Sequence, residues 1–467
     1  MLLERFYDDT LAQASYLLGC SAAGDAIVID PNRNLQQYLT KAAAEGLRIT
    51  AVTETHIHAD FVSGARELAT MTGAELLLSG EGGDDWSYRF AAEAGARLLH
   101  DGDVHDVGAV RLGVLHTPGH TPEHLSFLVT DRAASEHPIG MFTGDFVFVG
   151  DVGRPDLLER AAHFAGTMDT SARGLFHSLQ RTRGLPDHLQ LWPGHGAGSA
   201  CGKALGAVPS TTLGYERLAN WAFQIDDEDS FVRHVLAGQP EPPRYFAVMK
   251  SVNRDGPAPR STSELRRVSV DDAQAAVRRG AVIVDVRPTS EYSARHVIGA
   301  VAVPYGRSFT NYAGTVLSYD DDYVVFARDE AEARRARLAL SLIGTDRVIG
   351  WTSASNLDAW SSRHLVESLP AISIEEASNA AAERILDVRG ASEWAEGHIP
   401  SAEHAYLGDL LERVAHVPHA TPLVLLCETG SRSVIAASVL RRAGFTNVRS
   451  LSGGLRAWQD SGLPIEK

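Results

Sequence analysis

Imidazole and carboxylate groups are concentrated in one short stretch of this chain, Thr55-His-Ile-His-Ala-Asp-Phe61. The stretch follows the apolar run 47–52, and this order predicts a buried strand that ends in a polar loop. Because side chains alternate along an extended segment, His56, His58 and Asp60 project to one side and can reach one point in space. Imidazole and carboxylate groups bind zinc, iron and manganese. The stretch therefore predicts a metal-binding loop.

Similar side chains recur where three later strands are expected to end. A Pro-Gly turn between two predicted strands carries His120, an apolar run ends in Asp145, and a Trp-Pro-Gly turn carries His195. On the strand before the first turn, His116 is interpreted as structural. His124 is either a ligand or a supporting group. Repetition of this pattern at four strand ends indicates one shared site.

The elements that must position these residues alternate between strands and helices. Paired strands are predicted within 14–31 across the turn at Gly24, followed by a helix over 35–44. A strand then leads to His56, and a second helix is expected over 63–71. This β-β-α-β order predicts a layered α/β domain.

Composition limits the class of protein. A length of 467 residues suggests about three domains, and 44% apolar with 22% charged residues is ordinary for a globular chain. The formal net charge of −16 argues against nucleic acid as the main partner. Three scattered cysteines, Cys20, Cys201 and Cys427, do not form a disulfide framework. With no signal-peptide pattern and no apolar run of membrane length, we expect a cytoplasmic protein without membrane partners.

In chain order, the motifs His-x-His-x-Asp, Thr-Pro-Gly-His, Thr-Gly-Asp and Pro-Gly-His resemble those of the metallo-β-lactamase superfamily. This resemblance implies an αββα sandwich over residues 1–250. Phe61 is a departure, because two-metal hydrolases of the superfamily carry a histidine there that helps to hold the second ion. A phenyl ring has no lone pair for a metal, so we predict a single ion.

Segments 54–64, 149–157 and 198–206 are similar to the persulfide dioxygenase branch of that superfamily. The resemblance implies one Fe(II) per chain, held by two histidines and one aspartate that leave open positions for oxygen and substrate. The implied ligands are His56, His120 and Asp145, and the implied supporting or water-holding residues are His58, Asp60 and His195.

Cys201 follows the last turn in a glycine-rich segment that also contains Lys203. One interpretation is a buried structural thiol. In the alternative, Cys201 and Lys203 flank the path of the substrate sulfur, where a cation favours an anionic persulfide.

A segment rich in Pro, Gly and Ser predicts a linker over 251–263. Beyond it lies an internal repeat, because 282–300 matches 385–402 and 323–327 matches 423–427. Two copies of a strand-and-helix unit predict two small α/β domains with parallel sheets, over 264–368 and 369–467.

Both copies resemble rhodanese: both contain Asp-Val-Arg, and the second contains Gly-His-Ile-Pro where the first has the related Arg-His-Val-Ile. The six-residue loop Cys427-Glu-Thr-Gly-Ser-Arg432 is expected to present backbone N–H groups and a helix start to the cysteine sulfur. Cys427 is the predicted nucleophile, and Arg432 is expected to add a fixed positive charge. The predicted substrate-contacting residues of the loop are Glu428, Thr429, Gly430 and Ser431. Ala327 replaces the cysteine in the first copy, which is interpreted as a structural or docking module.

Together these features predict a sulfur-oxidising fusion enzyme. Its iron site would oxidise a low-molecular-weight persulfide (of glutathione, coenzyme A or a similar thiol) with O2, and Cys427 would transfer sulfane sulfur with thiosulfate as substrate or product. A zinc thioester hydrolase of the glyoxalase II type is the main alternative. A non-catalytic persulfide carrier or sensor is the third. By analogy with related dioxygenases, we expect a homo-oligomer.

Overall fold

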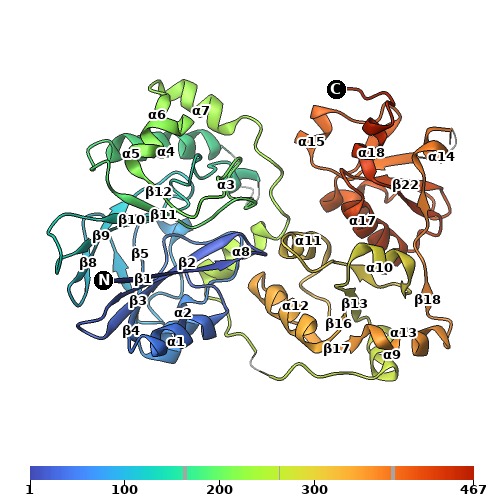
Figure 1. Ribbon diagram of the computed structural model, residues 1–467, viewed down its shortest axis with the longest axis horizontal. Helices are drawn as coiled ribbons and strands as arrows, with labels where there is room; N and C mark the ends of the chain where they lie inside the picture. Colours follow the sequence, from blue (N-terminus) through green and yellow to red (C-terminus); the bar gives the residue numbers. More distant parts are fainter. Residues whose placement is uncertain (161–165, 262, 380–383) are drawn as a thin grey trace. The chain divides into compact units, whose positions relative to one another are not determined.

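The computed structural model describes residues 1–160, 166–261, 263–379 and 384–467. The chain divides into two compact units (Figure 1). The first comprises Met1–Arg260 together with Leu342–Gly344, and the second comprises Ser261–Ser341 and Thr345–Lys467. Among the described residues, no helix combines the length and apolar character needed to cross a membrane.

Two six-stranded sheets form the centre of the first unit. The first sheet runs in the order β1 (Leu2–Asp8), β2 (Gln13–Cys20), β3 (Asp25–Ile29), β4 (Arg48–Thr53), β5 (Glu75–Ser79) and β6 (Arg97–Leu99). The second runs in the order β12 (Thr211–Thr212), β11 (Gln190–Pro193), β10 (Gly140–Gly144), β9 (Leu125–Asp131), β8 (Val110–His116) and β7 (Val104–Val107). The predicted strands on either side of Gly24 are β2 and β3, paired antiparallel.

Helices cover the outer faces of both sheets (Figure 1). Tyr38 of α1 (Leu35–Ala44) and Leu68 of α2 (Ala65–Thr72) share one buried cluster with the first sheet. Leu175 of α4 (Met168–Thr182) and Phe231 of α7 (Glu228–Leu236) share another with the second sheet. The remaining helical segments of this unit are η1 (Asp84–Trp86), α3 (Leu157–Arg160), α5 (Leu213–Ala219), α6 (Trp221–Gln224) and α8 (Phe246–Asp255).

A third cluster lies between the sheets and combines residues of both, such as Ile27 with Phe127. The three apolar clusters lie between helices and the first sheet, between the two sheets, and between the second sheet and its helices. This order of layers confirms the predicted αββα sandwich. The predicted helix over 35–44 is α1, and the helix expected over 63–71 is α2.

Strand direction explains why the ligand loops meet. Strands β3 and β4 are parallel, as are β10 and β11, so the segments that follow each pair leave the same sheet edge. The start of β9 lies beside the end of β10 because these two strands are antiparallel. The loops that carry the predicted ligands therefore emerge together.

The expected linker over 251–263 is wrong at its start. Residues 251–255 belong to α8, and Asn253 is buried against the metal-binding loop. The low apolar content of this segment concealed a helix that is held by polar contacts.

The second unit contains the two repeated domains, each with a parallel sheet. The first sheet has the order β15 (Val301–Ala302), β13 (Val282–Asp285), β16 (Tyr323–Ala327) and β17 (Val348–Ser353). The second has the order β19 (Ala371–Ile372), β23 (Val448–Leu451), β22 (Leu423–Leu426), β20 (Arg384–Asp387) and β21 (Ala402–His404). Equivalent strands take equivalent places, which confirms the repeat. A small pair is formed by β14 (His296–Val297) and β18 (Val366–Glu367).

Helices complete both repeats. They are α9 (Val270–Arg278), α10 (Thr289–Ala294), α11 (Phe309–Val316), α12 (Glu330–Leu342), η2 (Ala354–Asn356), α13 (Leu357–Ser361), α14 (Ile374–Asn379), α15 (Ala391–Glu396), η3 (Leu407–Asp409), α16 (Leu410–Arg413), α17 (Ser431–Arg442) and α18 (Gly454–Asp460). One apolar cluster includes Phe326 of the first copy and Leu425 of the second. The copies therefore share a core, as expected if the first has a structural role.

Candidate functional site

His56, His120 and Asp145 converge at the edge of the sandwich. Their ligand atoms lie within 4.8 Å of one another, and all three side chains are buried. One carboxylate oxygen of Asp145, Oδ2, is 3.9 Å from His56 Nε2 and 3.4 Å from His120 Nε2. The structure therefore brings together the three ligands that the sequence resemblance implied.

Unpaired polar atoms show that this group fits a cation. His56 Nε2 and both carboxylate oxygens of Asp145 are buried without a hydrogen-bond partner. Such orphaned atoms are rare and call for an ion or a water. Burial lowers the pKa of His120 and, with nearby histidines, lowers that of His56 well below its ordinary value. Both rings are then neutral and offer a lone pair to a metal.

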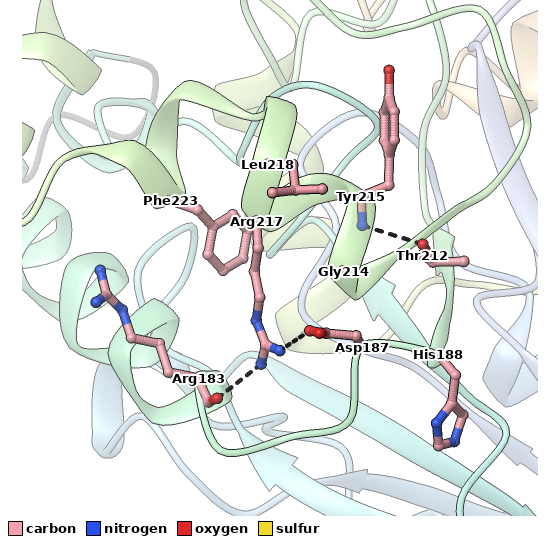
Figure 2. A pocket seen from close by; sticks show the side chains of 9 residues that line it. All are labelled: Arg183, Asp187, His188, Thr212, Gly214, Tyr215, Arg217, Leu218 and Phe223. Carbon is pink, nitrogen blue, oxygen red and sulfur yellow. Dashed lines mark hydrogen bonds and ion pairs between the residues drawn. The ribbon is translucent and has the colours of Figure 1, made fainter.

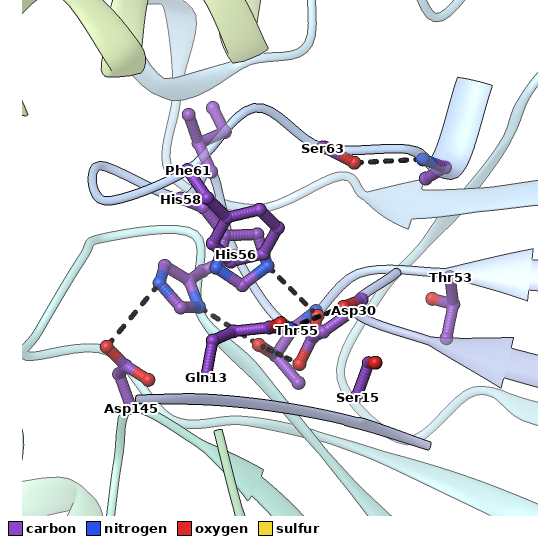
Figure 3. A network of polar contacts seen from close by, with 12 residues as sticks. Gln13, Ser15, Asp30, Thr53, Thr55, His56, His58, Phe61, Ser63 and Asp145 are labelled. Atoms are coloured by element: carbon purple, nitrogen blue, oxygen red, sulfur yellow. Dashed lines mark hydrogen bonds and ion pairs between the residues drawn. The ribbon is translucent and has the colours of Figure 1, made fainter. Parts of the chain in front are cut away.

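Asp30 supports two histidines at once, and the sequence analysis missed it. Its carboxylate accepts from the Thr55 backbone N–H at 2.6 Å, contacts His58 Nε2 at 3.1 Å, and accepts from Thr55 Oγ1 at 3.0 Å (Figure 3). Thr55 Oγ1 in turn lies 2.9 Å from His56 Nδ1. Burial lowers the pKa of His58, but the carboxylates of Asp30, Glu54 and Asp60 together outweigh burial and raise that pKa to about 9.

The backbone of Asp30 is left-handed, with φ of 52°. Aspartate is among the few non-glycine residues that adopt this conformation readily. An Asp-Pro pair at the end of an apolar strand, at the edge where His56 emerges, was the signal that could have revealed this residue.

His124 supports the carboxylate ligand. Its Nδ1 lies 2.9 Å from Thr117 Oγ1, and its Nε2 accepts the backbone N–H of Asp145 at 3.0 Å. His116 instead contacts the carbonyl of Pro122 at 2.7 Å. The structure thus gives His124 the supporting role and His116 the structural one.

A second group of donors adjoins the first. Ligand atoms of Asp60, His195 and Cys201 lie within 4.8 Å of one another. His195 Nε2 is 3.3 Å from Asp60 Oδ2 and 3.5 Å from Asp145 Oδ1. Burial and these two carboxylates raise the pKa of the Cys201 thiol well above its ordinary value. The thiol faces the metal-binding group and is not an isolated core residue.

Phe61 does not lie in this second group. Its ring packs on His58 with centroids 4.3 Å apart and contributes no ligand atom. The prediction of a single ion therefore rests on the missing ligand at position 61, and counting the bound metal tests it.

Lys203 does not take the role expected for it, which was to flank the path of the substrate sulfur with Cys201. Its Nζ donates to the carbonyl of Ala237 at 2.8 Å, so its hydrogen bond is directed to the segment after α7. A buried cation of this region is Arg154, whose guanidinium donates to the Ala200 carbonyl at 3.2 Å and forms two hydrogen bonds with Asp156, at 2.8 and 2.7 Å. The Arg154 carbonyl contacts His120 Nδ1 at 3.1 Å and thereby orients that ligand.

Asn253 of α8 clamps the metal-binding loop. Its side-chain amide donates to the carbonyls of His58 and Phe61, each at 2.7 Å, and accepts from the Ser63 N–H at 2.9 Å. All these groups are buried, so the loop has three fixed points supplied by a helix far along the chain.

A separate cavity of about 830 Å³ lies around α5 (Figure 2). Its charged groups are already paired: Arg217 binds Asp187, and Arg183 binds Asp226 at 2.6 Å. None of its lining residues belongs to the predicted site. They are Arg183, Asp187, His188, Thr212, Gly214, Tyr215, Arg217, Leu218 and Phe223.

In the second unit, Cys427 lies between β22 and α17, as the sequence predicted. Its side chain is buried, and its sulfur accepts the backbone N–H of Gly430 at 3.2 Å. Gly430 has φ of 104°, a conformation that favours glycine and turns this N–H toward the sulfur. In the first copy Ala327 is the last residue of the equivalent strand β16, which confirms that the nucleophile is missing there.

Arg432 supplies the fixed positive charge that was expected, but the structure pairs that charge with a carboxylate. Its guanidinium forms two hydrogen bonds with Glu393 of α15, at 2.6 and 2.7 Å. Burial lowers the pKa of Arg432, but Glu393 outweighs burial and raises it. The group stays charged, and its charge is neutralised by the carboxylate.

Replacing Asp30 with asparagine tests the support of the histidines. Asn tolerates the left-handed backbone but cannot accept hydrogen bonds through both side-chain atoms. We expect Asp30→Asn to weaken the binding of a divalent metal about 10- to 100-fold, as measured by anaerobic competition with a chelator. Asp25→Asn, on the same strand in an exposed pair with Arg48, is the control and should bind the metal normally. Unchanged affinity in Asp30→Asn contradicts this role.

Asn253→Leu tests the clamp. Two carbonyls and one N–H lose their partner, and each buried orphan costs about 1–3 kcal/mol. We expect backbone amide exchange across 56–63 to accelerate about 100-fold, measured by mass spectrometry. Gln36→Leu, an exposed amide on α1, is the control. Equal protection in both variants would exclude the clamp.

Comparison with known proteins identifies the families of the domains in both units. Residues 8–195 match the metallo-beta-lactamase superfamily, and residues 269–358 and 372–461 each match the rhodanese-like domain. A crystal structure titled as a metallo-beta-lactamase from Staphylococcus aureus shares 40% identity and a TM-score of 0.69, covering 76% of this chain and 99% of that one.

Two curated relatives differ in their named activities. The mitochondrial persulfide dioxygenase ETHE1 of Bos taurus is 28% identical over 42% of this chain and 68% of its own length. A hydroxyacylglutathione hydrolase of Polaromonas sp. is 32% identical over 42% of this chain and 66% of its own length. The shared fold, motifs and domain matches lead to one conclusion: this chain belongs to the metallo-β-lactamase superfamily and carries two rhodanese-like domains after that domain.

Proposed function

We propose that the first unit is a persulfide dioxygenase and that the second transfers sulfane sulfur through Cys427. The overall oxidation is balanced as RSSH + O2 + H2O → RSH + SO3²⁻ + 2H⁺. The observation that carries the proposal is a buried set of two neutral imidazoles and one carboxylate in the same chain as a sulfurtransferase cysteine loop.

The residues of the site fit a single Fe(II). When bound, this metal supplies the redox chemistry that lets O2 react with a persulfide. His56, His120 and Asp145 would hold it from one side. Asp60 and His195, whose free carboxylate and Nε2 atoms are buried beside that set, can orient substrate or water through hydrogen bonds.

Thioester hydrolysis is the second candidate, favoured by the similarity to hydroxyacylglutathione hydrolase. That reaction requires a metal-activated water but no sulfur-transfer centre. Two features favour oxidation instead: the Cys427 loop in the same polypeptide, and the aromatic residue at position 61.

Metal content and oxygen uptake separate these functions. From anaerobically purified protein we expect one Fe per chain and oxygen consumption that depends on added persulfide, such as glutathione persulfide. Asp145→Ala should abolish both, because it removes a ligand. One equivalent of zinc, thioester cleavage and no persulfide-dependent uptake would establish the hydrolase instead, and two bound ions would refute the single-ion prediction.

Cys427→Ser tests the division of labour. We expect oxygen consumption to persist and sulfur exchange to fall at least 100-fold, because a hydroxyl cannot carry sulfane sulfur. Cys20→Ser, a buried thiol of β2, is the matched control and should retain both activities. Loss of both activities in Cys427→Ser would show that the two centres are obligately coupled.

A further inference from the structure

The positive charges around the Cys427 loop are paired with carboxylates. Arg432 is bound to Glu393, as described above. Arg389 is buried, forms hydrogen bonds with Asp387 and lies 3.5 Å from Glu428 Oε2. Arg456 Nε lies 3.8 Å from the other oxygen of Glu428. Three guanidinium groups thus meet three carboxylates.

The balance of these charges affects which sulfur donors can approach Cys427, because donors differ in their own net charge. Sites that select dianions use guanidinium forks or ammonium groups with charge to spare. Here Glu428 directly follows the nucleophile and is about one-third exposed, while two of the three cations lie against it. An approaching dianion therefore meets a carboxylate beside the sulfur and no surplus of positive charge among these groups.

The first copy, which has Ala327 in place of the cysteine, carries these charges in the opposite order. Arg328 and Glu332 stand where the active loop has Glu428 and Arg432. The buried Glu332 carboxylate accepts the Arg328 backbone N–H at 2.8 Å and its guanidinium at 2.7 Å. In the first copy, therefore, a carboxylate of the protein itself binds the first residue after the strand. In the active copy the arginine turns to α15, and the loop N–H of Gly430 is left for the cysteine sulfur.

We propose that Glu428 is a specificity-determining residue that directs Cys427 toward persulfide donors of little net charge and against the thiosulfate dianion. This inference rests on the proposed sulfur transfer. The Cys427 thiolate forms a bond to the outer sulfur of the donor, whose sulfur–sulfur bond breaks. The donor leaves as a thiol, taking the proton that the outer sulfur carried, and Cys427 retains the sulfane sulfur as a persulfide anion. No external oxidant or reductant is needed.

Single-turnover loading of Cys427 in the full chain tests the proposal, with cyanide-releasable sulfur as the readout. The donors are thiosulfate, which carries two negative charges, and cysteine persulfide, whose ammonium and carboxylate charges cancel and which carries at most one negative charge on its outer sulfur. We expect Glu428→Gln to raise the loading rate from thiosulfate about tenfold and from cysteine persulfide less than twofold, because only the dianion is strongly repelled. Added salt should accelerate thiosulfate loading of the wild type more than that of Glu428→Gln.

Two variants serve as controls. Glu403→Gln makes the same change in charge, but it removes a partner of Arg384. Arg384 pairs with Leu423 at the start of β22, whereas Cys427 follows the end of that strand. Glu403→Gln should leave both rates unchanged. Glu428→Asp keeps the charge and should keep the discrimination, which a purely structural role of the side chain would not predict.

Three results would overturn the inference: equal acceleration with both donors, no acceleration with thiosulfate, or wild-type loading from thiosulfate as fast as from cysteine persulfide. Failure of the wild type to load from either donor would be different. It would refute the proposed sulfur transfer itself, and this inference with it.

Discussion

The metal-binding group depends on one buried carboxylate that is not expected to bind the metal. Asp30 fixes Thr55 and His58 directly and His56 through the Thr55 hydroxyl, from a left-handed backbone at the end of β3. Because β3 and β4 are parallel, this carboxylate emerges beside the loop it supports. Polar groups buried in this way are stable only when their hydrogen bonds are satisfied, so the network fixes the imidazoles in one arrangement. The ligand atoms that remain unpaired are the ones left for a cation.

Segments far along the chain complete that site. Asn253 of α8 holds the loop from 58 to 63, and Arg154 connects the His120 loop to the segment that contains Cys201. These contacts are polar and buried, and such contacts have large effects when broken. The metal-binding group of the first unit therefore depends on residues well outside the ligand motifs, up to the last helix before the chain leaves this unit.

The Cys427 loop is built mainly from residues that are close together in the sequence. Six consecutive residues form the cradle, and Gly430 directs its N–H to the Cys427 sulfur. What lies around the loop is less local, because α15, the segment after β20 and α18 supply the residues that pair its charges. The first copy has an equivalent parallel sheet, but Arg328 and Glu332 reverse the order of charges found at Glu428 and Arg432. The same fold therefore carries a cysteine loop in one copy and a loop with an internal Arg328–Glu332 pair in the other.

The sequence by itself determined the layered α/β fold, the repeat, the three converging ligands and the cysteine loop. Strand patterns and short motifs are local, and parallel strands necessarily bring their ends to one edge. Only the tertiary structure decided the roles of Asp30, Asn253 and Arg154, the pairing of Arg432 with Glu393, and the hydrogen bond of Lys203 to the Ala237 carbonyl. These depend on partners distant in sequence, so no local pattern encodes them. The sequence pattern around Asn253 predicts a linker, because a helix that is anchored by hydrogen bonds lacks the apolar periodicity by which helices are recognised.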